Sequence, residues 1–162
     1  MSTPRIIDQS FLNQISDQAK ASPRRRKNFN FHANEADASH RLLNAIAPGS
    51  YIVPHRHQDP NKDESIVLLR GRLGAVFFDE SGEVTERGVL EAGGAQVMLN
   101  VPHGTYHTVV ALAPGTLFFE AKAGPYRPLG PDERAPWAPQ EGDPEAAPYL
   151  ARLESLLRGF GA

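Results

Sequence analysis

Between residues 24 and 123 the chain is a succession of short apolar runs separated by segments rich in glycine and proline. The runs are YIVPHRH, SIVLLRGRLGAVFFD, GVLEAGG, AQVMLNVP, TYHTVVALA and TLFFEAK, and the segments between them include DESG, EAGG, VPHG and APGT. Glycine and proline favour turns and interrupt helices, so these runs are predicted to be strands. Strands at this spacing are typical of an antiparallel sandwich or barrel rather than of alternating strands and helices. The predicted fold is therefore mainly β, with residues 24–123 as an antiparallel β-barrel.

A helix is predicted before this region, over residues 7–21. Apolar residues recur there at helical spacing, at Ile7, Phe11, Leu12, Ile15 and Ala19. Asp8 or Ser10 is expected to cap its first turn, and Pro23 to end it.

The C-terminal part of the chain has a different character. Residues 124–148 hold half of the chain's 14 prolines and its only tryptophan. Such a segment can form neither a helix nor a central strand, so it is predicted to lie extended on the surface of the barrel. Trp137 is expected to anchor it, and a partner-binding tail is the alternative. A closing helix is predicted over 144–158, with Asp143 as its N-cap and Pro144 at its first position.

Length and charge narrow the functional classes. A chain of 162 residues suits one domain, 1–162. A formal charge of -2 gives no overall attraction to nucleic acid or to an anionic membrane. No stretch approaches the roughly 20 apolar residues of a membrane span, and the first residues lack an apolar signal core, so we expect a cytoplasmic protein. The apolar stripes of the two predicted helices need covering, which is compatible with a homodimer.

His55 and His57 stand one residue apart where a strand is predicted to begin. Side chains two residues apart on a strand lie on the same face, so the two rings are expected to point the same way. The chain has no cysteine, which leaves histidine and carboxylate as its strong metal ligands. The pair could belong to a solvated hairpin, but we favour a metal site.

The spacing around this pair resembles the two sequence motifs of the cupin superfamily. Gly49 begins Gly-x5-His-x-His, Glu64 begins Glu-x6-Gly, and PHGTYH at 102–107 matches Pro-x-Gly-x2-His. Cupins are small jelly-roll β-barrels in which three histidines and a glutamate typically bind one divalent metal. The resemblance implies a zinc, iron, manganese or nickel ion, metals that suit this ligand type. The ligands implied are His55, His57, Glu64 and His107.

The glutamate of this motif is separated from His57 by six residues, whereas cupins usually have three or four. The usual distance falls on Lys62. Either Glu64 reaches the site after a small insertion or the carboxylate ligand is absent, with Glu64 then a surface carboxylate paired with Lys62. Lys62 could itself point toward the pocket and hold an anionic ligand, or be a charge at its rim.

Four further segments are similar to the WbuC family of cupin-fold metalloproteins. They are SPRRRKNFNFH, RLLNAIAPGSYIVPHRH, GPYRP and APWAPQEGDPEAAPYLARL. The resemblance runs from about residue 7 to residue 157. That family is named after a member associated with bacterial O-antigen gene clusters, so the resemblance implies a fold, a metal and a link to surface polysaccharide, but no reaction.

Polar residues alternate with phenylalanines in RRRKNFNFH. If this segment is extended, one face is apolar and the other polar. The polar face could simply meet water. It could instead line the mouth of the metal pocket, with the arginines binding a carboxylate or phosphate and the remaining groups binding a polyol or sugar. The residues of this polar face are Arg24, Arg26, Asn28, Asn30 and His32.

Three functions compete. The first is a metal-dependent enzyme acting on a small polar, anionic substrate such as a sugar derivative or organic acid, with the metal as Lewis acid and template. The second is a binding module that holds such a ligand without transforming it, since Glu120 is the nearest candidate base apart from the ligands. The third is a metal-free cupin similar to sugar-nucleotide epimerases, with histidine as base.

Overall fold

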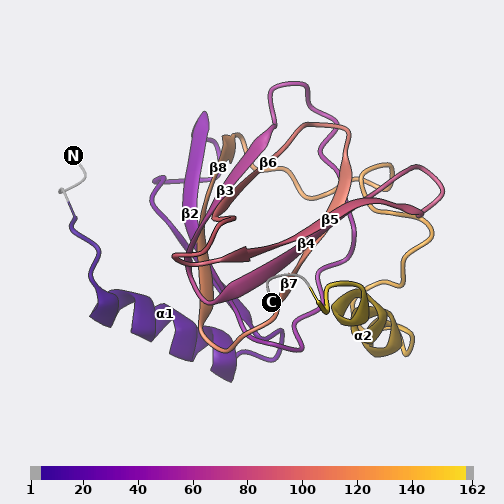
Figure 1. Cartoon of the computed structure of the whole chain (residues 1–162). Helices are drawn as coiled ribbons and strands as arrows, with labels where there is room; N and C mark the ends of the chain where they lie inside the picture. Colours follow the sequence, from indigo (N-terminus) through magenta and orange to yellow (C-terminus); the bar gives the residue numbers. More distant parts are fainter. Residues whose placement is uncertain (1–4, 160–162) are drawn as a thin grey trace.

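The computed structural model describes residues 5–159, which form two antiparallel sheets and two helices (Figure 1). In both sheets the strand order departs from the chain order, because successive strands cross between the sheets. The five-stranded sheet has the order β1 (Arg26–Asn30), β2 (Ser39–Ile46), β8 (Thr116–Ala123), β3 (Glu64–Arg70) and β6 (Met98–Val101). The three-stranded sheet has the order β5 (Val84–Glu91), β4 (Arg72–Phe78) and β7 (Tyr106–Ala111).

Apolar side chains from both sheets meet in a core between them. Alternate residues of each strand face this core, as expected for two packed sheets. Its buried members are Ile46, Ile66, Leu68, Leu73, Ala75, Leu90, Val109, Ala111 and Phe118. The mainly β class is thus confirmed. The two sheets pack face to face and are not closed into a barrel.

The predicted run SIVLLRGRLGAVFFD is divided at Gly71. β3 ends just before this glycine and β4 begins just after it, and the two strands belong to different sheets. Gly71 has φ of 81°, a left-handed conformation that suits glycine. A Cβ atom there would lie 2.7 Å from Thr116 Cα, so no side chain fits. The motif glycine therefore marks the crossing between the sheets.

Helix α1 (Gln9–Ala21) lies on the outer face of the five-stranded sheet. Its N-cap is Asp8, which accepts a hydrogen bond from the Phe11 amide at 2.8 Å, so the first of the two predicted caps is confirmed. Its buried stripe packs on Leu43, Ala45 and Leu117 of the sheet.

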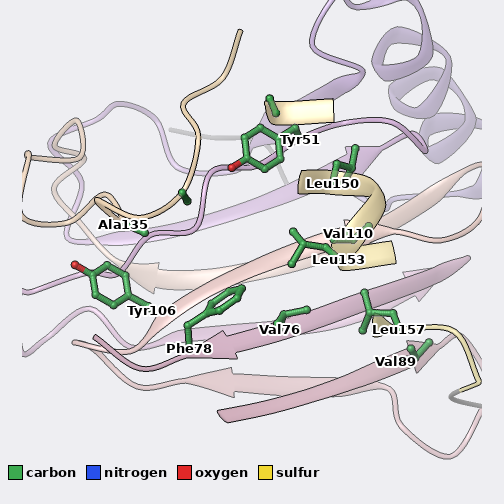
Figure 2. Packing of buried hydrophobic residues seen from close by; sticks show 12 residues of the cluster. Tyr51, Val76, Phe78, Val89, Tyr106, Val110, Ala135, Leu150, Leu153 and Leu157 are labelled. Carbon is green, nitrogen blue, oxygen red and sulfur yellow. The ribbon is translucent and has the colours of Figure 1, made fainter. Parts of the chain in front are cut away.

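Helix α2 (Ala146–Leu156) covers the outer face of the three-stranded sheet, where Leu150 and Leu153 lie over Val76 and Val110 (Figure 2). Both helical stripes are therefore covered by the chain itself and no longer argue for a dimer. Neither helix of the described residues 5–159 is long and apolar enough to span a membrane.

The predicted start of α2 is wrong by two residues. The helix begins after Glu145, and Pro144 lies before it rather than at its first position. The predicted cap, Asp143, instead accepts a hydrogen bond from the Gln140 amide at 2.7 Å. Its carboxylate is thus used in the turn that precedes the helix.

The proline-rich segment packs on the three-stranded sheet. The ring of Trp137 lies 4.9 Å from that of Phe78 and 5.8 Å from that of Tyr106, in agreement with an anchoring role. The same segment also pairs with the chain around Pro54: the Ala135 amide donates to the Pro54 carbonyl at 3.0 Å, and the Arg56 amide donates to the Glu133 carbonyl at 2.8 Å. The tail is therefore bridged to residues 54–56 by backbone hydrogen bonds.

His40 of β2 is a buried polar residue, only 4% exposed. Its ring stacks on that of His32, with centroids 3.9 Å apart, and its Nε2 lies 3.2 Å from the Glu35 carbonyl. Burial and the neighbouring His32 lower the pKa of His40 below its ordinary value.

We expect this stacked pair to make the protein less stable in acid. The lowered pKa means that the unfolded chain takes up a proton before the folded one does, so unfolding is favoured as pH falls below the ordinary histidine value of 6.5. Denaturant unfolding between about pH 8 and pH 5 measures the slope. His40→Gln should reduce this pH dependence of the free energy of unfolding. An unchanged slope in the variant would show that His40 is not its cause.

Candidate metal centre and adjoining cavity

The two closely spaced histidines do not lie on a regular strand, which corrects the sequence expectation. Pro54 lacks an amide proton, and within residues 51–58 the backbone makes only isolated bridges. One bridge pairs His55 with His107 of β7, through amide-to-carbonyl hydrogen bonds of 3.0 and 2.9 Å. This pairing brings their ring centroids within 4.7 Å, and the His57 ring lies 5.4 Å from that of His55.

Glu64 joins this group despite its long separation from His57. It is the first residue of β3 and is 4% exposed. Its Oε1 lies 2.9 Å from His57 Nε2, and its Oε2 lies 3.1 Å from His107 Nε2. Lys62 turns away and donates to the Pro125 carbonyl at 2.9 Å. Of the two positions considered from the sequence, only Glu64 reaches the histidines.

Backbone carbonyls orient two of the rings. The Nδ1 atom of His55 lies 2.9 Å from the Val53 carbonyl oxygen, and the Nδ1 atom of His107 lies 2.9 Å from the Thr105 carbonyl oxygen. Because a carbonyl only accepts, Nδ1 carries the proton, which leaves Nε2 as the nitrogen that can bind a metal. Burial, with a smaller contribution from His107, lowers the pKa of His55 to about 3, so this ring is neutral at physiological pH.

Two polar residues that were not predicted from the sequence, Lys122 and Asn44, complete the group. Lys122 Nζ lies 2.6 Å from both Glu64 Oε1 and Glu120 Oε1, and Asn44 donates to Glu120 Oε2 at 2.7 Å. Phe118, Glu120 and Lys122 stand two residues apart along β8 and so lie on the same face of the strand, and this period of two in TLFFEAKA was a signal for a polar patch on the inner face.

The charges of this group depend on one another. Burial raises the pKa of Glu64, but its contacts with His107 and His57 and the charge of Lys122 outweigh burial and hold the pKa well below its ordinary value. At Lys122 burial has the opposite effect and lowers the pKa, but the two carboxylates more than compensate and raise the pKa above its ordinary value. Burial dominates at Glu120, whose pKa is raised.

A cavity of about 280 Å³ lies between the sheets beside these groups. Its lining combines polar groups with six apolar side chains. Its lining comprises Arg24, Arg26, Lys27, Asn28, Leu42, Asn44, Ile46, Ile52, His55, Glu64, Ile66, His107, Val109, Phe118, Glu120 and Lys122.

Three of the five residues of the predicted polar face reach this cavity: Arg24, Arg26 and Asn28. Asn30 does not line it and instead accepts a hydrogen bond from Asn28 at 2.8 Å. His32 is buried against His40, outside the cavity. The phenylalanines between them pack beneath α1, on the outer face of the sheet, so the polar side of β1 lies on the cavity side. Arg24, Asn28 and Asn30 are nevertheless exposed to solvent, so this polar face meets both the cavity and water.

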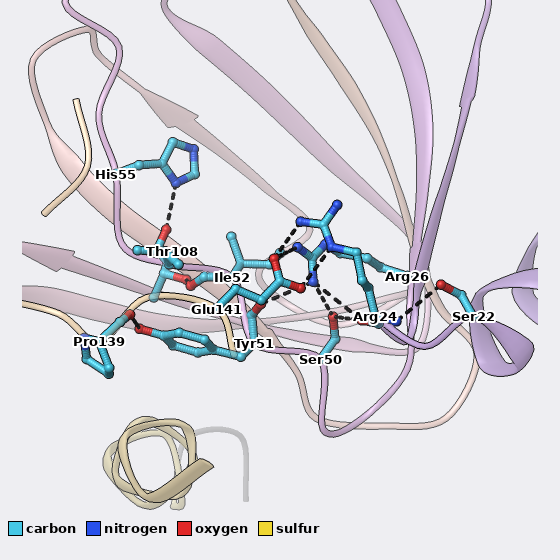
Figure 3. Close-up of polar contacts among 11 residues, drawn as sticks. Ser22, Arg24, Arg26, Ser50, Tyr51, Ile52, His55, Thr108, Pro139 and Glu141 are labelled. Atoms are coloured by element: carbon cyan, nitrogen blue, oxygen red, sulfur yellow. Dashed lines mark hydrogen bonds and ion pairs between the residues drawn. The ribbon is translucent and has the colours of Figure 1, made fainter. Parts of the chain in front are cut away.

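The arginines at the mouth bind a carboxylate of the chain's own tail (Figure 3). Arg24 contacts both oxygens of Glu141, at 2.8 and 2.6 Å, and Arg26 contacts one of them at 2.8 Å. The hydrogen bond from Arg24 is the main reason why the pKa of Glu141 falls to about 2.

The donor set fits a divalent metal by its chemistry, although the side chains of residues 5–159 as they stand include no group of three or more His, Cys, Asp or Glu spaced to hold one. The two nitrogens of His107 face Thr105 O and Glu64 Oε2, both oxygen acceptors. A neutral imidazole has a single N–H, so it satisfies only one of them. A cation bound at Nε2 would satisfy the nitrogen lone pair and the carboxylate together.

The two packed antiparallel sheets form a jelly-roll type of fold. The chain belongs to the family described as a domain of unknown function (DUF6016), whose model matches residues 7–90. No curated protein shows significant similarity to it.

Solved structures support the fold. KdgF from Halomonas sp. is 19% identical over 65% of this chain and 84% of its own, with a TM-score of 0.51. A cupin superfamily protein from Desulfitobacterium hafniense DCB-2 is 14% identical over 60% of this chain and 76% of its own, with a TM-score of 0.48. A variant of Bacillus subtilis oxalate decarboxylase is 17% identical over 60% of this chain and 24% of its own, with a TM-score of 0.47. Of these three, only the likeness to KdgF bears on the fold.

Proposed function

We propose that this protein is a metal-binding cupin that holds a small anionic ligand in the cavity next to the ion. His55, His57, Glu64 and His107 would hold the metal. The observation that carries this proposal is the position of His107, whose ring has oxygen acceptors at both nitrogens inside a cavity shared with His55 and Glu64. Three imidazoles and one carboxylate suit zinc, iron, manganese or nickel.

The cavity walls support a small ligand with a negative charge. Four basic side chains line it against two acidic ones, so an anion is favoured on balance. Arg24 and Arg26 would bind the anionic end at the mouth, and Asn28 and Asn44 supply hydrogen-bonding groups along the way. A sugar acid or another organic acid has this chemistry, and the resemblance to the WbuC family would link such a ligand to surface polysaccharide.

Bound metal would supply Lewis acidity and orient ligand oxygens. The protein's own residues would orient the ligand from the mouth, exclude water with the apolar side chains of the lining, and keep Glu64 ionised through Lys122.

A binding module without catalysis is the second candidate. Glu120 is the candidate base of the cavity, yet both of its oxygens are engaged, one by Lys122 at 2.6 Å and one by Asn44 at 2.7 Å. Turnover that depends on the metal would favour the enzyme, whereas ligand binding without turnover would favour the module.

Elemental analysis after reconstitution tests the metal proposal. We expect about one equivalent of metal in the parent protein and less than about a tenth of that in His57→Ala, because a site that has lost one of its four ligands binds metal far more weakly. His103→Ala is the matched control, since His103 is exposed and bonds to Asp63 outside the cavity. A parent protein that takes up none of the four metals would refute the proposal.

A further inference from the structure

The mouth of the cavity already contains a bound carboxylate, which belongs to the protein itself. Glu141 is met by Arg24 through two parallel hydrogen bonds and by Arg26 through a third. Two parallel hydrogen bonds from one guanidinium are the geometry by which arginine recognises carboxylates. The structure thus displays how a carboxylate fits this pair of arginines.

Arg26 is held in place without Glu141. Its Nη1 donates to the Tyr51 carbonyl at 3.1 Å and to Ser50 Oγ at 3.3 Å, and its side chain is 19% exposed. The side chain of Arg24 is 62% exposed, so it is the less enclosed member of the pair. Arg25, between them, adopts φ of 55°, a strained conformation for a residue with a side chain. The binding geometry is therefore largely built into the backbone around Arg26.

The tail that carries Glu141 is also fixed. Tyr51 Oη donates to the Pro139 carbonyl at 2.7 Å (Figure 3), and the turn that follows is closed by the Asp143 amide, which donates to the Gln140 carbonyl at 3.1 Å. The Glu141 side chain itself is 36% exposed. It can therefore leave the arginines by rotating into solvent while the tail stays in place.

We propose that Glu141 occupies the place of the ligand's carboxylate in the empty protein, and that an incoming carboxylate displaces it from Arg24 and Arg26. The ligand would then be an organic acid with its carboxylate at the mouth and oxygen groups toward the histidines. That second half of the inference rests on the proposed function, whereas the displacement of Glu141 does not require a metal.

This exchange sets a threshold for binding. Glu141 is tethered beside the arginines and so competes at a high effective concentration. A ligand that offers only a carboxylate gains little by replacing it, because one ion pair is exchanged for another. A ligand that also makes contacts deeper in the cavity gains those contacts in full. Glu141 would thus select against simple carboxylates.

Binding of succinate to the metal-free full-length chain, measured by calorimetry, tests the exchange. We expect Glu141→Gln and Glu141→Ala to bind succinate at least about tenfold more tightly than the parent, because the competing charge is gone. Glu86→Gln on β5 removes the same charge outside the cavity and should bind as the parent does. Adding Arg26→Ala to Glu141→Gln should abolish the gain.

The outcomes separate this inference from the metal proposal. Equal succinate affinity in the parent and in both Glu141 variants would overturn the exchange, even if every variant binds zinc normally. A tenfold gain that is lost with Arg26→Ala would support it, even if no variant binds zinc, in which case only the metal proposal fails. Thermal unfolding of each variant confirms that it is folded.

Discussion

Replacing Glu64 with alanine is expected to lower the free energy of unfolding of the metal-free protein by about 3–5 kcal/mol. Glu64 is 5% exposed at its side chain and contacts His57, His107 and Lys122 at 2.6 to 3.1 Å. Its loss leaves the largely buried ammonium of Lys122 with one carboxylate instead of two, and leaves a cavity in place of the side chain. Urea unfolding in the presence of a chelator measures the change.

A double-mutant cycle identifies the ion pair as the cause. Lys122→Met alone leaves two buried carboxylates without their cation and should also destabilise the protein. If the pair is responsible, combining it with Glu64→Ala should cost less than the sum of the two changes, with a coupling of about 1–3 kcal/mol. A Glu64→Ala protein within about 1 kcal/mol of the parent would show that this group adds little to stability. Loss of bound metal in the same variant would separately support Glu64 as the fourth ligand.

Gly71→Ala should be nearly as damaging, at about 2–5 kcal/mol, because two costs add. The first is the left-handed backbone, with φ of 81°, which is unfavourable for any residue with a Cβ atom. The second is the contact of that Cβ with Thr116, 2.7 Å from its backbone Cα, where the strand cannot easily yield. Denaturant unfolding again measures the effect.

Gly93→Ala separates the two costs. Gly93 has a similar φ of 78°, but a Cβ there would meet nothing within 4 Å. This control should therefore lose only about 1–2 kcal/mol, the cost of the backbone conformation. Equal losses at the two positions would mean that the contact with Thr116 is harmless and that the crossing between the sheets tolerates a side chain.

Local patterns predicted much of the fold. The helical spacing and the cap at Asp8 gave α1, and the glycine- and proline-rich segments separated most of the strands. Predictions were poorest where a residue's local role depended on a distant one. Asp143 was expected to cap a helix because nothing nearby revealed its bond to Gln140. The burial of His40 could not be predicted either, because its partner, His32, follows only from the pairing of β1 with β2.

The candidate site divides in the same way. His55 and His57 stood out because they are one residue apart in a chain without cysteine, and Glu64 and His107 because the sequence around them resembles the cupin motifs. Lys122 had a weaker signal, a polar residue in phase with Phe118 on an otherwise apolar strand. The partner of Arg24, Glu141, lies 117 positions away in the tail, and no local pattern could have paired the two.

The tail's pairing with residues 54–56 makes the site a property of the whole chain. A fragment ending at residue 123 would keep all eight strands and every side chain proposed to bind metal. It would nevertheless lack the backbone of Glu133 and Ala135, which forms hydrogen bonds with the segment that carries His55, on the edge opposite His107. The smallest unit able to assemble the site is therefore larger than the pair of sheets. Substitutions in the proline-rich tail should change the positions of the histidines.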